Sequence, residues 1–173
     1  MTIGPRTRAA LIASLFLAPI VASLAVYRFG HPQASANYGE LILPPRLAPA
    51  PLAQLRGRWV LVTSDSGACE EACRQKLYAM RQVRLALGRN ASRVARVLVI
   101  DDDHALDAGT QAADAGLDVV RIATQARGDR AHIYLADPHG NVMLRWPSNP
   151  DLRRMYQDID RLLKASQIGR RVE

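Results

Sequence analysis

The stretch WVLVTSDSGACEEACRQKLYAMRQ, residues Trp59–Gln82, decides the fold. It opens with a short apolar and β-branched run, which is the pattern of a strand buried on both faces. After a loop containing Gly67, a segment over Glu70–Leu87 repeats apolar residues at helical spacing. The two cysteines of the chain, Cys69 and Cys73, lie where the strand pattern gives way to the helix pattern. A thiol pair directly after a first strand indicates a thioredoxin-like domain.

Strand and helix patterns alternate after this stretch. Gly88 is expected to end the helix that follows the cysteines. A second buried strand is predicted over Arg96–Asp101, and a weaker helix over about Ala105–Ala115. A strand-like run follows from Leu117, and Ala131–Trp146 has the pattern of a hairpin. A βαβ unit followed by a ββα unit is typical of a thioredoxin-like α/β fold, which we therefore expect here.

The last helix has the clearest pattern in the chain. We expect Asn149 to cap it, Pro150 to occupy its first turn, Asp151 to favour its positive end and Gly169 to close it. Its apolar residues form one stripe at helical spacing, which indicates a face packed on the core. The stripe consists of Leu152, Met155, Tyr156, Ile159, Leu162 and Leu163.

An uncharged run near the N-terminus predicts a membrane anchor. It covers the 19 residues Ala9–Tyr27. At the helical rise these residues span about 28 Å, close to the hydrocarbon thickness of a bilayer. We expect a cytoplasmic N-terminus over residues 1–8 and a single transmembrane anchor over residues 9–28. A cleaved signal peptide is the alternative, with Ser23-Leu24-Ala25 or Ala34-Ser35-Ala36 as the small-residue site. The run is, however, longer than the usual apolar region of about 7–15 residues.

The charges beside the anchor predict its orientation. Arg6 and Arg8 precede the run, which favours an N-terminus on the inner side, although Arg28 weakens this asymmetry. We therefore expect a single-pass protein of the inner membrane whose soluble domain is extracytoplasmic, in the periplasm. That space is usually oxidising, so two cysteines there would by default form a disulfide.

Between the anchor and the first core strand the chain is rich in Pro and Ala. We expect residues 29–56 to form a tether, with at most one short strand over Glu40–Leu43 that Pro44 and Pro45 end. The thioredoxin-like domain would then cover residues 57–173.

The charge pattern argues against one class of partner. The net charge is +7, which raises the possibility of binding nucleic acid or an anionic membrane surface. The arginines are scattered, however, with acidic residues between them and no basic block interleaved with aromatic residues. The pattern therefore argues against a nucleic-acid partner and fits proximity to anionic lipid or to an acidic protein.

The cysteine spacing predicts a reactive or metal-binding pair. Residues four apart at a helix start share one face, so Cys69 and Cys73 should converge. The helix N-terminus and Arg74 would stabilise a thiolate, while Glu70 and Glu71 oppose it. Thiolates favour soft metals, above all Cu(I). A structural zinc site would need four protein ligands, so one soft ion held by two sulfurs and one histidine nitrogen fits the chain better.

Four histidines are available as a third ligand. His31 lies in the predicted tether, His104 in a loop after the acidic cluster Asp101–Asp103, and His139 in the hairpin turn, where ordinary loop and turn roles explain them. His132 opens the strand HIYLA, and in a thioredoxin-like fold this strand start lies beside the helix that carries the thiols. His132 is therefore our candidate ligand, with an ordinary strand-end histidine as the alternative.

Several segments together resemble one known family. GRWVLV, CEEACRQKLYAMRQV, VLVIDDD and IYLADPHGNVMLRWP, with the N-terminal anchor, are similar to the Sco/SenC family of membrane-anchored, thioredoxin-like copper proteins. The resemblance covers roughly Leu55–Leu163. It implies that Cys69 and Cys73 bind copper and that a distal histidine completes the site. It also implies a role in assembling the dinuclear copper centre of cytochrome c oxidase, with the copper-bearing subunit or another assembly factor as the partner.

Two positions depart from the family pattern. Arg74 follows the second cysteine, where the family usually has proline. When YLADP is aligned with the family's strand, the usual histidine position falls on Asp129, and His132 stands three residues later. Because strand side chains alternate, a shift of three residues need not point the same way. Either a local loop difference lets His132 act as the ligand, or the third ligand is missing.

Three functions remain open from the sequence. The first is a copper-handling assembly factor, without turnover as an enzyme, whose metal ligands are Cys69, Cys73 and His132. The second is a membrane-tethered thiol–disulfide oxidoreductase, in which one of the two thiolates attacks a partner disulfide and the other resolves the mixed species. The third is a binding or scaffold protein whose disulfide holds a loop, although so small a loop gains little stability from chain entropy.

Overall fold

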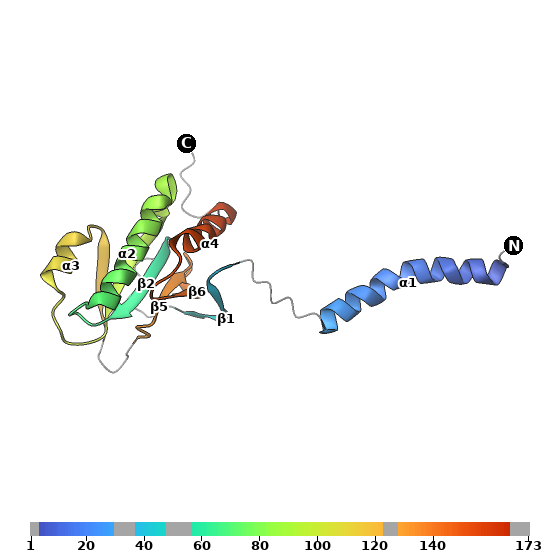
Figure 1. Ribbon diagram of the computed structural model, residues 1–173, viewed down its shortest axis with the longest axis horizontal. Coiled ribbons are helices and arrows are strands. Elements are labelled where there is room, and N and C mark those ends of the chain that lie inside the picture. Colours follow the sequence, from blue (N-terminus) through green and yellow to red (C-terminus); the bar gives the residue numbers. More distant parts are fainter. Residues whose placement is uncertain (1–3, 30–36, 48–56, 123–127, 167–173) are drawn as a thin grey trace. The chain divides into compact units, whose positions relative to one another are not determined.

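The computed structural model describes residues 4–29, 37–47, 57–122 and 128–166 (Figure 1). The chain divides into two compact units, Met1–Ala36 and Asn37–Glu173. The first unit is built on one helix, α1 (Pro5–Phe29). Its segment Pro5–Val26 has a mean hydropathy of 2.4 and is long and apolar enough to cross a membrane. The predicted apolar helix is therefore present, and Pro19 lies inside it.

The second unit is a six-stranded mixed sheet with the strand order β1-β6-β5-β2-β3-β4. The strands β2, β3 and β4 run parallel, and β5, β6 and β1 add to β2 in antiparallel pairs. The helices α2 and α3 and the short 3₁₀ segment η2 connect strands, and α4 follows the last strand, β6. This arrangement confirms the predicted thioredoxin-like α/β fold. The bounds are β1 Glu40–Leu47, β2 Trp59–Asp65, α2 Glu71–Ala86, η2 Gly88–Arg93, β3 Val94–Ile100, α3 Ala108–Ala113, β4 Leu117–Arg121, β5 His132–Ala136, β6 Asn141–Pro147 and α4 Leu152–Ala165.

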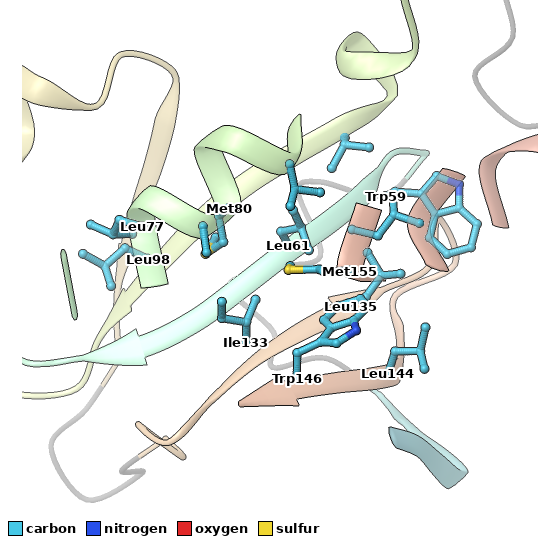
Figure 2. Packing of buried hydrophobic residues seen from close by; sticks show 14 of the residues in the cluster. Trp59, Leu61, Leu77, Met80, Leu98, Ile133, Leu135, Leu144, Trp146 and Met155 are labelled. Atoms are coloured by element: carbon cyan, nitrogen blue, oxygen red, sulfur yellow. The ribbon is translucent and has the colours of Figure 1, made fainter. Parts of the chain in front are cut away.

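Alternating side chains give the sheet two apolar faces. Leu61 of β2 belongs to a large cluster with the apolar faces of α2 and α4, whereas Val60 and Val62 belong to a smaller Val- and Ala-rich cluster on the other face. Figure 2 shows side chains of α2, α4 and the sheet turned toward one another in the large cluster. Because β2 is buried on both faces, each of its apolar residues contributes to the stability of the domain. Truncating one fully buried leucine lowers the free energy of unfolding by about 2–5 kcal/mol. The labelled members are Trp59, Leu61, Leu77, Met80, Leu98, Ile133, Leu135, Leu144, Trp146 and Met155.

The cysteine-bearing helix matches its predicted bounds within one residue. Its buried face includes Leu77, Met80 and Val83. Leu87 is the C-cap, and Gly88 follows it with φ = +54°. This conformation favours glycine, so Gly88 is the predicted C′ residue.

Two helix starts differ from the sequence prediction. Asp151 caps α4, because its carboxylate accepts the amide N–H of Arg154 at 3.0 Å, so the expected capping by Asn149 and the placing of Pro150 inside the helix were wrong. Asp107 caps α3 in the same way through Thr110 at 2.8 Å, which makes this helix start later and run shorter than Ala105–Ala115. In both cases the carboxylate that reaches the third amide decides the start. The predicted end at Gly169 lies outside the described residues.

Part of the segment that we expected to be a tether belongs to the sheet. The strand β1 continues through Pro44 and Pro45 to Leu47, with a cis bond between Leu43 and Pro44 and a register shift between Leu41 and Arg46. The prediction that the prolines end this strand was wrong, because β1 is an edge strand, where missing amide donors and irregular pairing are tolerated.

One buried carboxylate fastens the start of this strand to the domain. Asp158 of α4, which is 2% exposed, accepts the backbone N–H groups of Tyr38 at 3.0 Å and Gly39 at 2.7 Å. The same carboxylate accepts the indole N–H of Trp146 at 3.1 Å. Hydrogen bonds to a buried charge are among the stronger ones, so this single side chain joins β1, β6 and α4.

Asp158→Asn should therefore destabilise the domain by about 2–4 kcal/mol, because an amide cannot accept all three N–H groups as the carboxylate does. The measurement is urea unfolding of the full chain in detergent, followed by the fluorescence of its two tryptophans, Trp59 and Trp146. Asp160→Asn on the same helix is the matched control, because the pair that Asp160 forms with the exposed Lys164 lies at the surface and is worth at most about 1 kcal/mol. Equal losses in both variants would contradict this account of Asp158.

Candidate functional site

The two cysteines converge as the spacing predicts. Cys69 and Cys73 form a disulfide with a Cα–Cα distance of 5.0 Å. Cys73 lies in the first turn of α2, and Cys69 precedes its N-cap residue, Glu70. Both cysteines are buried, at 0% and 1% exposure, and belong to the large apolar cluster. The pair therefore lies at the carboxyl end of β2, on the side of the sheet that α2 covers.

The backbone of Cys69 is held in an uncommon conformation. Its φ is +41°, in the left-handed region, which costs a non-glycine residue roughly 1–2 kcal/mol. Its N–H donates to the carbonyl oxygen of Ser66 at 3.1 Å, and its own carbonyl oxygen accepts Nη1 of Arg74 at 3.1 Å. Bonds on both sides of the residue thus compensate for the conformation that directs its sulfur toward Cys73.

The N-terminus of α2 has no side-chain cap from its N-cap residue. Glu70 makes no capping hydrogen bond, so its carboxylate does not neutralise the positive end of the helix dipole. A thiolate formed at this place would be stabilised by the first-turn N–H groups.

Residues of the segment after β3 hold the loop between β2 and α2, residues 66–70, which we call the cysteine loop. Asp102 accepts the N–H of Gly67 at 3.0 Å and that of His104 at 3.2 Å. The hydroxyl of Ser66 and the amide of Gly67, with His104, hold the pKa of Asp102 well below its usual range. The carbonyl oxygen of Gly67 accepts the N–H of Asp107 at 3.0 Å. A Cβ atom on Gly67 would overlap the carbonyl oxygen of His104, so only glycine fits this approach.

A buried polar network that the sequence analysis missed lies under the site. The ammonium group of Lys76, fully buried in α2, contacts Asp65 at 2.7 Å and the carbonyl oxygens of Ser64 at 2.9 Å and Arg130 at 2.7 Å. The guanidinium of Arg130 donates in turn to Asp101, whose carboxylate is fully buried. The sequence did carry a signal for this network. Lys76 lies on the apolar face of a helix, and a buried ammonium group needs hydrogen-bond acceptors around it.

His132 lies on the other face of the sheet from the disulfide. Its neighbours on β5, Ile133 and Leu135, belong to the large cluster that holds the cysteines. His132 and Tyr134 point the opposite way, as strand alternation requires, and both contact Asp129. Nδ1 of His132 is 2.6 Å from Asp129, and the hydroxyl of Tyr134 donates to the same carboxylate at 2.5 Å. The structure therefore does not bring His132 to the sulfurs.

No alternative metal cluster is present in residues 4–29, 37–47, 57–122 and 128–166, since no group of three or more His, Cys, Asp or Glu side chains there is arranged to hold an ion. His104 is exposed and pairs with Asp102 at 3.3 Å, and His139 lies in the hairpin turn. His31 lies outside the described residues. The sulfurs are thus the soft ligands that the described site offers.

Two shallow hollows border the exposed side of α2. One lies between α2 and α3, and the other between α2 and the start of α4. Arg74 and Tyr78 line both of them, and Tyr78 is 60% exposed. A partner that approaches the cysteine loop along α2 would therefore meet Arg74 and Tyr78.

The polar cluster of Asp129, His132 and Tyr134 shifts the pKa of two of its members. Burial and the hydrogen bond to Asp129 raise the pKa of Tyr134 to about 12. Burial opposes the ionisation of Asp129, but Tyr134, the amide of Ala131 and His132 outweigh it and lower the pKa of Asp129 to about 2.

Asp129→Asn should bring the pKa of Tyr134 down toward the ordinary value of about 10, because the carboxylate that disfavours the tyrosinate is gone. Ultraviolet absorbance of tyrosinate over an alkaline titration of the full chain measures this, and Tyr134→Phe assigns the step. Since the folded-state pKa is raised, the stability from this bond is present below about pH 10 and is lost as the pH rises through about 12. Asp137→Asn in the hairpin turn is the control, and it should leave the titration of Tyr134 unchanged. A Tyr134 titration that stays near pH 12 in Asp129→Asn would contradict the placement of Asp129 beside Tyr134.

Comparison with known proteins agrees with the fold. A family model described as "transmembrane-like, thioredoxin-like, C-terminal domain" matches residues 59–166. No curated protein sequence matches the chain.

Several solved structures share the fold of this chain. Apo Sco1 from Thermus thermophilus is 17% identical, with 75% of this chain and 96% of that chain covered and a TM-score of 0.56. Yeast Sco1 with copper bound is 14% identical, with 65% and 82% covered and a TM-score of 0.55. BsSco, a Sco-family protein studied for a disulfide switch, is 18% identical, with 66% and 83% covered and a TM-score of 0.50. The predicted resemblance to the Sco/SenC family is confirmed, and at these identities it establishes the fold.

Proposed function

Because the chain belongs to the family of transmembrane-like, thioredoxin-like C-terminal domains, we propose that it is a membrane-anchored thiol protein that handles copper through Cys69 and Cys73. Its task would be to assist assembly of the copper centre of cytochrome c oxidase. The observation that carries the proposal is the disulfide between two cysteines at the uncapped N-terminus of α2. This position gives the reduced pair thiolate character and makes it a soft ligand pair.

The structural relatives support the copper and oxidase parts of the proposal. Yeast Sco1 has been solved with copper bound. BsSco is described as a member of the Sco family of cytochrome c oxidase assembly proteins, and a disulfide switch has been identified in it. A thiol pair that changes between two oxidation states in the same fold would serve both delivery of copper and reduction of a partner's cysteines.

The chemistry needs the reduced form of the pair. Two electrons and two protons from an external dithiol convert the disulfide into two thiols, and binding of Cu(I) then releases protons from the sulfurs. Cys69 and Cys73 would hold the ion as two thiolates. His132 faces the other side of the sheet and is held by Asp129, so we do not include it in the copper site.

The disulfide itself favours a second candidate function, thiol–disulfide exchange. In the reduced chain, one of the two thiolates would attack a partner disulfide, and the partner's other sulfur would leave as a thiolate. The second thiolate of this chain would then break the mixed disulfide, so that the partner is reduced and the Cys69–Cys73 disulfide forms. Among the described residues no third ligand lies beside the sulfurs. Copper binding and thiol–disulfide exchange therefore depend on the same two sulfurs.

We further propose that α1 anchors the protein with its N-terminus in the cytoplasm and its domain outside. Arg6 and Arg8 before the apolar run support this orientation. Alkaline phosphatase, which is active only outside the cytoplasm, should be active when it is fused after residue 173 in a bacterial host. Mass measurement of the membrane-bound protein should find Met1 or its neighbour at the N-terminus. An inactive fusion would contradict the orientation, and a shortened chain would show a cleaved signal peptide.

Copper titration of the reduced full chain in detergent tests the main proposal. We expect one Cu(I) per chain, lost in both Cys69→Ser and Cys73→Ser because a single thiolate cannot hold the ion against a competing chelator. His132→Ala should bind as the wild type does, because its side chain faces away from the sulfurs. Loss of binding in His132→Ala would show that the strand start rearranges to supply a ligand. If the wild type binds no copper but its cysteine pair exchanges with glutathione, the copper proposal fails and thiol–disulfide exchange remains as the function. If the pair does not exchange either, the disulfide is structural.

A further inference from the structure

The outward face of α4 carries positive charge from its first turn to its last. The opposite face is buried in the large apolar cluster, so the exposed side chains of the helix point away from the core. These exposed positions recur at helical spacing, which puts them on one side of the helix. The cations among them are Arg153, Arg154, Arg161 and Lys164.

The carboxylates of α4 offset this charge only in part. Asp158 lies on the buried side, where two backbone N–H groups and an indole N–H occupy it. Asp151 is the N-cap of the helix. Asp160 is 18% exposed and pairs with Lys164 at 2.7 Å. The outward face of α4 therefore carries more positive than negative charge.

The same helix holds the residues through which the chain enters the domain. The second compact unit begins at Asn37. The guanidinium of Arg154 lies 4.2 Å from the centroid of the Tyr38 ring, and Nη1 of Arg161 donates to the side-chain oxygen of Asn37 at 3.4 Å. The hydroxyl of Tyr38 accepts the N–H of Asp151 at 3.2 Å. The polypeptide thus enters the domain beside the basic face of α4.

The connection between α1 and this entry point is short. Helix α1 ends at Phe29, and residues 30–36 separate it from Asn37. At a maximum of about 3.6 Å per residue, this connection spans at most about 30 Å. A binding surface on so short a leash meets the surface that anchors it at a high effective concentration. A modest attraction is therefore enough to dock α4 on the membrane that α1 is proposed to span.

Anionic phospholipid headgroups have the charge that this face would bind. A guanidinium group holds phosphate oxygens with two parallel N–H bonds, and each Lys or Arg near an anionic bilayer adds to the attraction within a Debye length. The sequence adds Arg170 and Arg171 after α4, outside the described residues. An acidic protein offers the same charge, but the short connection favours the membrane, because it brings that surface within reach.

We propose that the outward face of α4 binds the anionic phospholipid headgroups of the membrane that anchors the chain. The inference rests on one part of the proposed function, the anchoring by α1. Docking would restrict the orientations of the domain at the membrane, so that partners meet a defined side of it.

Energy transfer from tryptophan to dansyl-labelled lipid headgroups, in the full chain reconstituted into vesicles, tests the proposal. The chain has two tryptophans, and the indole N–H of Trp146 donates to Asp158 of α4 at 3.1 Å, so Trp146 reports how close this helix is to the lipid. We expect stronger transfer in phosphatidylcholine vesicles that contain phosphatidylglycerol than in phosphatidylcholine alone. At about 1 M salt, where the Debye length is about 3 Å, the difference should disappear.

Substitutions on α4 should weaken the docking. Arg153→Gln, which leaves the contacts of Arg154 and Arg161 with the entry point in place, should lower the docking equilibrium constant about fivefold. The double variant Arg153→Gln, Arg161→Gln should lower it by roughly ten- to thirtyfold. Arg153→Lys, which keeps the charge, should dock as the wild type does.

The double variant Arg81→Gln, Arg121→Gln is the matched control. It removes the same charge away from α4, since Arg81 lines the hollow toward α3 and Arg121 ends β4, the edge strand opposite to β1. It should dock as the wild type does. An equal loss in this control would overturn the inference, because the attraction would then come from net charge. Equal transfer from the wild type in both kinds of vesicle would also overturn it and leave an acidic protein as the occupant of this face.

Flotation of the same vesicles separates this inference from the anchoring by α1. A chain that floats with both kinds of vesicle but shows equal transfer in them would uphold the anchor and refute the binding of headgroups by α4. A chain that floats only with vesicles containing phosphatidylglycerol, and loses this in the Arg153→Gln, Arg161→Gln variant, would uphold the inference and refute the anchor.

Discussion

The short connection between β2 and α2 must turn the chain from the sheet into the helix where there is no space for a side chain at Gly67. Its amide and carbonyl groups are taken by Asp102 and Asp107 of the segment after β3. The turn leaves Cys69 in a left-handed conformation and puts its sulfur beside Cys73. The position of the disulfide at the start of α2 therefore follows from how tightly two loops pack at the end of the parallel strands.

A second constraint, the alternation of side chains along β5, decides which residues share the site. Burying Ile133 and Leu135 under α2 and α4 puts His132 and Tyr134 on the opposite face. There Asp129 binds both of them. Moving His132 toward the sulfurs would require a slip of the strand by one residue, which would exchange its buried and exposed sides. The core packing thus separates the histidine from the thiols.

The sequence predicted the features that depend on local pattern. The order of strands and helices, the hairpin, the C′ glycine Gly88 and the converging cysteines all follow from periodicity and spacing, and the structure confirms them. It did not predict that β1 continues through Pro44 and Pro45 to Leu47, because pairing with β6 across some hundred residues overrides the local effect of the two prolines. The contacts of Lys76 with the loop at Arg130 depend in the same way on tertiary structure. Whether Asp151 or Asn149 caps α4 is decided by which side chain reaches a free amide.

Burial of both sulfurs places the same requirement on every reaction proposed for this site. Neither a copper ion nor a partner thiolate can reach a sulfur that is at most 1% exposed unless the surrounding loops move. The contacts that hold those loops are polar and lie at the protein surface, through Asp102, Asp107 and Arg74, whereas the contacts behind the sulfurs are apolar and belong to the core. A movement of these loops on the solvent side therefore breaks a few hydrogen bonds that water can replace. A movement of the elements behind the sulfurs would disrupt the apolar core. Access to the disulfide should come by way of the side where Arg74 lies.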